Sequence, residues 1–255
     1  MRLLLQILSL SDRYERKACL LPGLLLAAIP AMTAWAVLHE FATWDVAAGT
    51  SLGLEFLVAF VLGHLARARG RNIEEVLWKA WGGSPTTRWL RPWDTTCSDQ
   101  QKSKWRAAIK KLTGLTITAS VPASGDQTEV DRVNTDAVRQ LRYFLRGKPE
   151  AAMVATHNED YGFARNLCGV RWHWVVICVA CVVATAVAFA FGLKPFLGLA
   201  IAGVCSITAF LIARELPVYV RRCADRYAES LFATAVMVSQ APIHSDTEVA
   251  TTHGS

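Results

Sequence analysis

The stretch that decides the fold is Trp174–Gly192, WVVICVACVVATAVAFAFG, which contains no charged residue. At roughly 1.5 Å of rise per residue, a helix of this length matches the hydrocarbon core of a bilayer, which is about 30 Å thick. A second uncharged run, Pro195–Ala213, follows after a very short connection that carries Lys194. The two runs together predict a transmembrane hairpin over residues 172–213.

A matching pair of apolar runs lies earlier in the chain, at Cys19–Leu38 and Val46–Leu65. Only helices are expected here, because backbone polar groups in lipid must be satisfied within the segment. The first run is longer than the apolar region of a secretory signal, so we interpret it as a retained span. The sequence therefore predicts an all-α membrane protein with four transmembrane helices in two hairpins.

The distribution of Lys and Arg predicts the orientation of these spans. The connection His39–Asp45 contains neither Lys nor Arg, whereas arginines flank the opposite ends of the runs. Loops rich in Lys and Arg stay in the cytoplasm. We therefore expect a multi-pass protein of the cell inner membrane. Its N-terminus, residues 66–171 and C-terminus are expected to be cytoplasmic.

Composition separates the spans from the segment between them. Apolar residues make up 53% of the chain and charged residues 19%, which argues against a disordered chain, a coiled coil or a plain soluble enzyme. The formal net charge is +6, and residues 67–171 hold 18 Lys and Arg against 11 Asp and Glu. A basic segment beside a membrane favours anionic lipid or another anionic ligand as its partner.

The middle segment has the periodicity of helices. We expect one helix from an Asn72 cap to Gly82–Gly83, a second over residues 98–112 and a third over residues 128–146. The polar stretch THNEDYG, residues 156–162, is interpreted as a helix start. The predicted organisation is an N-terminal interfacial helix (1–18), a first transmembrane hairpin (19–65), a basic cytoplasmic helical domain (66–171), a second transmembrane hairpin (172–213), a cytoplasmic C-terminal helix opened by Pro217 (214–240) and a disordered tail (241–255).

One ionisable residue, Glu55, lies at the centre of a predicted span. A charge in that position costs about 3 kcal/mol on insertion scales, so such residues usually face a bundle interior or water. Glu55 then either lines a polar route or is protonated and bonded to a neighbouring helix. The same span carries Gly49 and Gly53, whose spacing favours close helix contact, and we expect a homo-oligomer.

The loop WGGSPTTRWLR, residues 81–91, is the candidate ligand site. Backbone amides, hydroxyls and arginines can together hold an anion such as a lipid phosphate or a nucleotide. The loop lacks the P-loop pattern, and a helical core with membrane-surface contacts is the alternative. Polymeric nucleic acid is not expected as a partner. The candidate residues are Gly82, Gly83, Thr86, Thr87, Arg88 and Arg91.

No set of residues predicts catalysis, a metal site or a cofactor. The seven cysteines have no spacing typical of a disulfide framework, and the pair Cys178 and Cys181 lies inside an apolar run. His157 and Glu159 lie close in sequence, but HExxH is absent. We therefore expect a protein that is not an enzyme.

Three stretches, Asp12–Pro22, Trp81–Arg91 and Tyr161–Val170, resemble a family of uncharacterised bacterial four-span membrane proteins. This resemblance implies a topology and no chemistry. The two-hairpin plan is also similar to the membrane effectors of anti-phage signalling systems. The leading hypothesis is a cytoplasmic sensing or partner-binding domain coupled to a four-helix membrane part that perturbs the bilayer. An ion channel or transporter using Glu55, and a membrane-bound enzyme using His157 and Glu159, are the alternatives.

Overall fold

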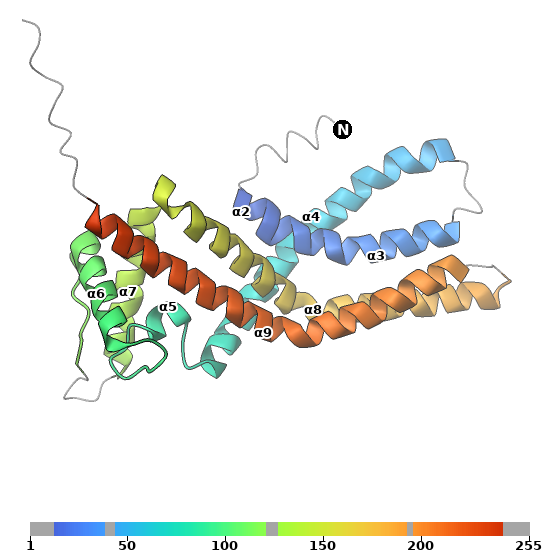
Figure 1. Ribbon diagram of the computed structural model, residues 1–255. Coiled ribbons are helices and arrows are strands. Elements are labelled where there is room, and N and C mark those ends of the chain that lie inside the picture. The colour runs from blue at the N-terminus through green and yellow to red at the C-terminus, as the bar shows by residue number, and fades with distance from the viewer. Residues whose placement is uncertain (1–12, 39–43, 121–126, 193–195, 242–255) are drawn as a thin grey trace, which may run out of the picture. The chain divides into compact units, whose positions relative to one another are not determined.

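The computed structural model describes residues 13–38, 44–120, 127–192 and 196–241. Within these ranges it describes only the backbone of residues 36–38 and 44–56. Within these ranges no β-strand occurs, which confirms the all-α prediction. The elements are α2 (Arg13–Glu15), η1, a π-helix (Arg16–Leu20), α3 (Leu21–Leu38), α4 (Trp44–Ala80), α5 (Pro85–Arg88), α6 (Asp99–Thr113), α7 (Gln127–Leu145), η2, a 3₁₀ turn (Pro149–Ala151), α8 (Ala152–Ala190) and α9 (Phe196–Gln240), as Figure 1 shows.

The chain divides into two compact units. The first unit combines Met1–Ser84 with Val154–Tyr227, and the second combines Pro85–Met153 with Ala228–Ser255. The borders fall inside α8 and α9, so both helices contribute residues to both units. The second unit therefore has different limits from the predicted cytoplasmic domain, because α4 and α8 continue without a break through positions 66 and 171.

Three helical segments in the described part are long and apolar enough to cross a membrane. They are Arg13–Trp35, Pro149–Ala190 and Phe196–Gln240. This finding supports a multi-pass membrane protein. The remaining predicted span, Val46–Leu65, lies within α4, but the side chains of residues 46–56 are outside the described ones, and that span stays a prediction.

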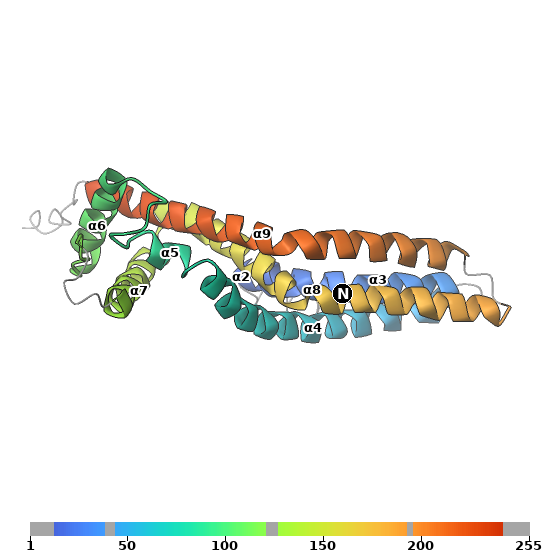
Figure 2. The same ribbon diagram turned by 90° about the horizontal axis from the view of Figure 1, so that it is seen from below.

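The first unit has an apolar core to which α3, α4, α8 and α9 all contribute. Figure 2 shows these four long helices, and in both views α3 lies beside α4. Tight backbone approach holds the first hairpin together, since a Cβ on Gly23 would lie 2.0 Å from the Ala59 carbonyl oxygen. The core includes Leu26, Ile29, Ala66, Leu167, Trp174, Cys178, Ala209, Leu216 and Val220.

The second unit is built around stacked aromatic rings. The Trp105 ring lies 6.0 Å from that of Trp89 and 4.7 Å from that of Phe232. Helix α6 begins after Ser98, whose hydroxyl accepts a 3.3 Å hydrogen bond from the Gln101 backbone N–H, as a helix cap does. The predicted helices over 98–112 and 128–146 are thus confirmed as α6 and α7.

Three predicted helix starts are wrong. Asn72 lies inside α4, where Ala66, Ile73 and Leu77 continue one face toward the core of the first unit. Pro217 lies inside α9, because Leu216 and Val220 on either side of it are buried in that core. Residues 156–162 lie inside α8, which already begins at Ala152. Of the predicted interfacial helix (1–18) and tail (241–255), residues 1–12 and 242–255 lie outside the described residues, and residues 13–18 belong to α2 and η1.

Candidate functional site

The predicted ligand loop begins where α4 ends. Gly82 and Gly83 have φ angles of 75° and 125°, a backbone region that favours glycine. The Gly83 N–H donates a 2.7 Å hydrogen bond to the Trp78 carbonyl and so caps the helix. The two glycines belong to the first unit, whereas the other four candidate residues belong to the second.

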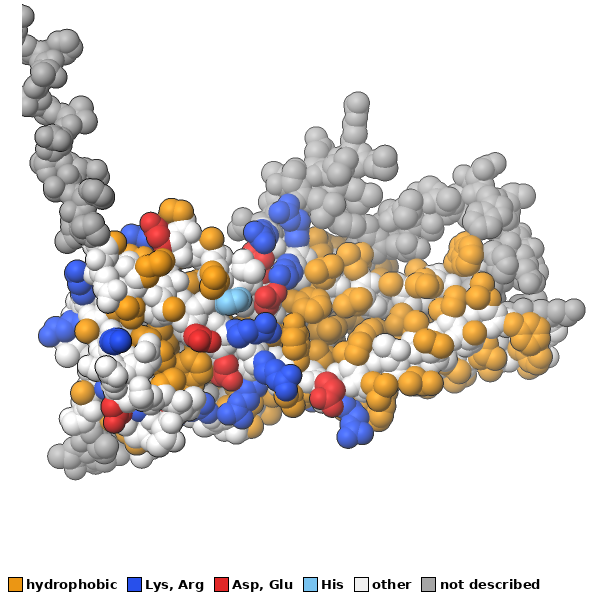
Figure 3. Space-filling view, viewed as in Figure 1, with side chains coloured by type: hydrophobic (Ala, Val, Ile, Leu, Met, Phe, Trp, Pro, Cys, Tyr) orange, Lys and Arg blue, Asp and Glu red, His pale blue; other side chains and the backbone are white. Residues whose placement is uncertain are grey.

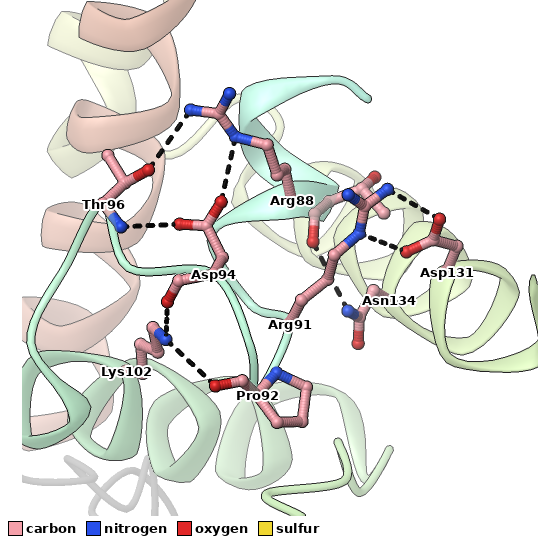
Figure 4. Close-up of polar contacts among 9 residues, drawn as sticks. Arg88, Arg91, Pro92, Asp94, Thr96, Lys102, Asp131 and Asn134 are labelled. Carbon is pink, nitrogen blue, oxygen red and sulfur yellow. Dashed lines mark hydrogen bonds and ion pairs between the residues drawn. The ribbon is translucent and has the colours of Figure 1, made fainter. Parts of the chain in front are cut away.

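The two arginines of the loop are each matched with a carboxylate, as Figure 4 shows. Arg91 makes a bidentate pair with Asp131 on α7, with nitrogen–oxygen distances of 2.6 and 2.7 Å. Arg88 lies 3.1 Å from Asp94, and its guanidinium also donates to the Thr96 hydroxyl at 3.3 Å. Bidentate charge-assisted bonds of this kind fix geometry as well as charge.

The two threonines of the loop are buried and face α7. Thr87 lies 3.3 Å from Thr135, hydroxyl to hydroxyl, and its carbonyl accepts a 3.4 Å hydrogen bond from the Asn134 amide. The Thr86 hydroxyl accepts a 3.5 Å hydrogen bond from Arg142. The hydroxyls that the sequence predicts as ligand donors therefore join α5 to α7.

A buried lysine holds the following residues. The Lys102 side chain is 1% exposed, and its ammonium donates to the backbone carbonyls of Pro92 and Asp94. Arg106 donates a 2.9 Å hydrogen bond to the Leu90 carbonyl, and burial lowers the pKa of its guanidinium. Burial, together with the nearby Asp94, raises the pKa of the Cys97 thiol. The loop is thus fixed by its own cations, and an anionic ligand at Arg88 or Arg91 would have to displace a carboxylate. The ligand assignment stays a prediction.

A second polar cluster lies in the first unit, between α4 and α8. Arg165 donates to both carboxylate oxygens of Glu74, at 3.1 and 3.3 Å. The Tyr161 hydroxyl donates a 2.6 Å hydrogen bond to the same carboxylate. The Arg165 and Glu74 side chains are only 11% and 14% exposed. A partly desolvated ion pair with a third hydrogen bond is costly to disturb, because removal of one partner leaves the other charge unpaired.

Asn166 connects this cluster to the π-helix η1. Its side-chain amide donates a 2.7 Å hydrogen bond to the Ala18 carbonyl, which belongs to that π-turn. Gly70 allows α4 and α8 to approach closely at this point, since a Cβ on Gly70 would lie 2.3 Å from the Asn166 side-chain oxygen. Gly169 likewise approaches the backbone of Arg69 and Gly70. We name Glu74, Tyr161, Arg165 and Asn166 the polar clamp.

Charged pairs join the start of the described chain to the same part of α8. Arg13 lies 3.4 Å from Glu159, and Lys17 lies 2.6 Å from Asp160. Glu159, predicted as one member of an alternative catalytic pair with His157, is therefore in an ion pair. Among the described residues no group of three His, Cys, Asp or Glu could hold a metal ion.

Sequence reasoning did not predict the polar clamp as a site, because its partners lie about ninety residues or more apart in the chain. The structure brings Asn166 into contact with Ala18, which lies 148 residues earlier in the chain. Glu55 lies in α4, and its side chain is outside the described residues.

No family model, curated protein or solved structure matches this chain.

Proposed function

We propose that this protein is an integral inner-membrane effector without enzymatic activity. Its four spans form a helical bundle, and its cytoplasmic helical unit binds a partner or an anionic ligand. Occupation of that unit is transmitted to the bundle, which then perturbs the bilayer.

The observation that carries this proposal is the outward-facing apolar surface of α8. Val176, Val183 and Val187 are 66%, 56% and 49% exposed, and their spacing places them on one face of the helix. The opposite face, with Trp174, Cys178 and Thr185, is buried. A contiguous apolar surface of this kind is rare in a protein surrounded by water, so lipid is the medium that suits it.

Helix α9 has the distribution of side chains expected in a lipid-embedded bundle. Its large residues, Val204 and Ile207, are each 66% exposed, whereas Ala202 and Ala209 are fully buried. Transmembrane bundles typically have small residues between the helices and large residues facing the lipid, because close backbone contact there replaces the hydrophobic effect. In Figure 3, hydrophobic side chains cover most of the described surface on the right of the view, and charged side chains gather on the left and centre.

Chain continuity supports the coupling of the two units. Helix α9 begins in the apolar bundle of the first unit, and its end places Phe232 in the aromatic core of the second. Helix α8 also crosses the border between the units without a break. The polar clamp joins α4 and the π-turn to the same helix α8. A conformational change in the second unit can therefore be transmitted to the first unit along α8 and α9, because neither helix is interrupted at the border.

Expression in bacteria tests this function. The wild-type protein should stay in the membrane pellet after a carbonate wash, and its expression should depolarise the cells, as read by a potential-sensitive dye. Phe232→Ala should remain in the pellet and lose depolarisation, because it removes the aromatic contact with Trp105. Met237→Ala, an exposed position on the same helix, is the matched control and should behave as wild type. Glu55→Gln should reduce depolarisation only in part.

Two results would contradict the proposal. One is wild-type protein in the supernatant before any detergent is added. The other is inserted protein whose expression leaves the membrane potential unchanged. Depolarisation that depends strictly on the Glu55 carboxylate would favour the channel alternative.

A further inference from the structure

A stripe of arginines continues the lipid-facing side of α9. Val204, Ile207 and Leu211 are exposed on one face, and Arg214 follows at the same helical spacing. Seven and eight residues further on, Arg221 and Arg222 extend that face and are also exposed. We name Arg214, Arg221 and Arg222 the arginine stripe.

Two cations near the start of the first span have acidic partners, and the stripe does not. Arg13 and Lys17 pair with Glu159 and Asp160 on α8. Within the described part of the chain, no ion pair or hydrogen bond involves the guanidinium groups of the stripe. Their positive charge is therefore available to an external anion.

Aromatic side chains beside the stripe are typical of a membrane interface. Trp172 on α8 is 49% exposed, and its ring lies 6.3 Å from that of Phe210, one turn before Arg214. The Arg171 guanidinium lies 5.8 Å from the same Trp172 ring. Tryptophan at the end of an apolar run marks the headgroup level of a bilayer.

The reach of the stripe fits a headgroup layer. Eight residues separate Arg214 from Arg222, which corresponds to about 12 Å along a helix. The headgroup region adds about 5–8 Å on each side of the hydrocarbon core, and a long arginine side chain can reach back toward it. The negative potential of anionic lipid extends over a Debye length of about 8 Å. All three guanidinium groups can therefore lie within that potential.

We propose that the arginine stripe binds the phosphate groups of anionic phospholipids in the cytoplasmic leaflet. This inference rests on the proposed membrane insertion. Continuity with the apolar face of α9 selects lipid as the occupant, because one phospholipid can place its acyl chains along Val204 and Ile207 and its phosphate at Arg214. A soluble anion or an acidic peptide would use only the charged half of this surface.

Native mass spectrometry of the full chain tests the proposal. The protein is extracted in mild detergent and offered equal amounts of phosphatidylglycerol and phosphatidylcholine with the same acyl chains. Wild type should carry more phosphatidylglycerol. The triple variant Arg214→Gln, Arg221→Gln, Arg222→Gln should lower the ratio of bound phosphatidylglycerol to bound phosphatidylcholine. The expected decrease is at least about fivefold, which is the contribution of a single arginine near an anionic surface.

The matched control removes the same charge elsewhere. Arg132→Gln, Arg139→Gln, Arg146→Gln replaces three exposed arginines, two on α7 and one directly after it, and should keep the wild-type ratio. A wild-type protein without preference, an equal loss in both triple variants, or loss of the preference when inorganic phosphate is added would each overturn the proposal. A carbonate wash of the starting membranes separates this failure from failure of insertion, since protein that is not inserted would leave the pellet.

Discussion

The Asn166 amide donates a 2.7 Å hydrogen bond to the carbonyl of Ala18, which lies 148 residues earlier in the chain. Both groups are buried, and the acceptor belongs to the π-turn Arg16–Leu20. A π-turn changes the hydrogen-bond partners of its backbone, and such turns often occur at functional positions. The bond therefore ties the entry of the first span to α8.

Replacement of Asn166 by Ala should destabilise the protein by about 1–3 kcal/mol, because the Ala18 carbonyl would lose its partner in a buried place. For a chain of this size we expect the unfolding midpoint in detergent to fall by roughly 2–4 °C per kcal/mol. Asn72→Ala, at an exposed position on α4, should change the midpoint little. Equal midpoints for the two variants would show that the Asn166 bond does not stabilise the fold.

Gly169→Ala should disrupt the contact between α4 and α8. A Cβ at this position would lie 2.5 Å from the Gly70 backbone nitrogen, and backbone atoms cannot move aside without shifting a helix. Gly203→Ala on α9 is the matched control, since nothing lies within 4 Å of its Cβ position. The control should be neutral or stabilise by about 1 kcal/mol through helix propensity. Thermal unfolding checks both, and a Gly169→Ala protein as stable as the Gly203→Ala protein would contradict the packing described.

The pair Glu74 and Arg165 should behave as a partly desolvated ion pair. Glu74→Gln should lower the free energy of unfolding by about 3 kcal/mol, because Arg165 would keep an unpaired charge. The double variant Glu74→Gln, Arg165→Gln should recover part of that loss. Glu75→Gln, at the exposed neighbouring position, should have little effect. A double variant less stable than either single variant would argue against the pairing.

The sequence predicted helices better than it predicted their ends. Apolar periodicity located α6 and α7, and α6 begins directly after Ser98, the first residue of its predicted range. It failed at Asn72 and Pro217, because local preference for a cap or a helix start is weaker than burial of Leu77 or Val220 against a neighbouring helix. The polar clamp could not be predicted from spacing, since Glu74 and Arg165 meet only after α4 and α8 pack.

A double-mutant cycle on Arg91 and Asp131 tests the loop that the sequence marks as a ligand site. We expect a coupling free energy of about 1.5–3 kcal/mol, as for hydrogen bonds to charged groups in a partly buried place. The pair Arg132 and Glu129 is 73% and 50% exposed, and its coupling should stay below about 1 kcal/mol. Equal coupling free energies in both pairs would mean that the bidentate contact stabilises the loop no more than an exposed ion pair does. Chemical or thermal unfolding of the full chain provides all the values.

We propose that the chain crosses the membrane four times with the segment around Arg139 inside the cell. The most direct measurement uses a chain whose seven native cysteines are replaced and a single cysteine is placed at Thr43 or at Arg139. A membrane-impermeant maleimide added to spheroplasts should label Thr43→Cys at once and Arg139→Cys only after lysis. Labelling of Arg139→Cys in intact spheroplasts would contradict the account.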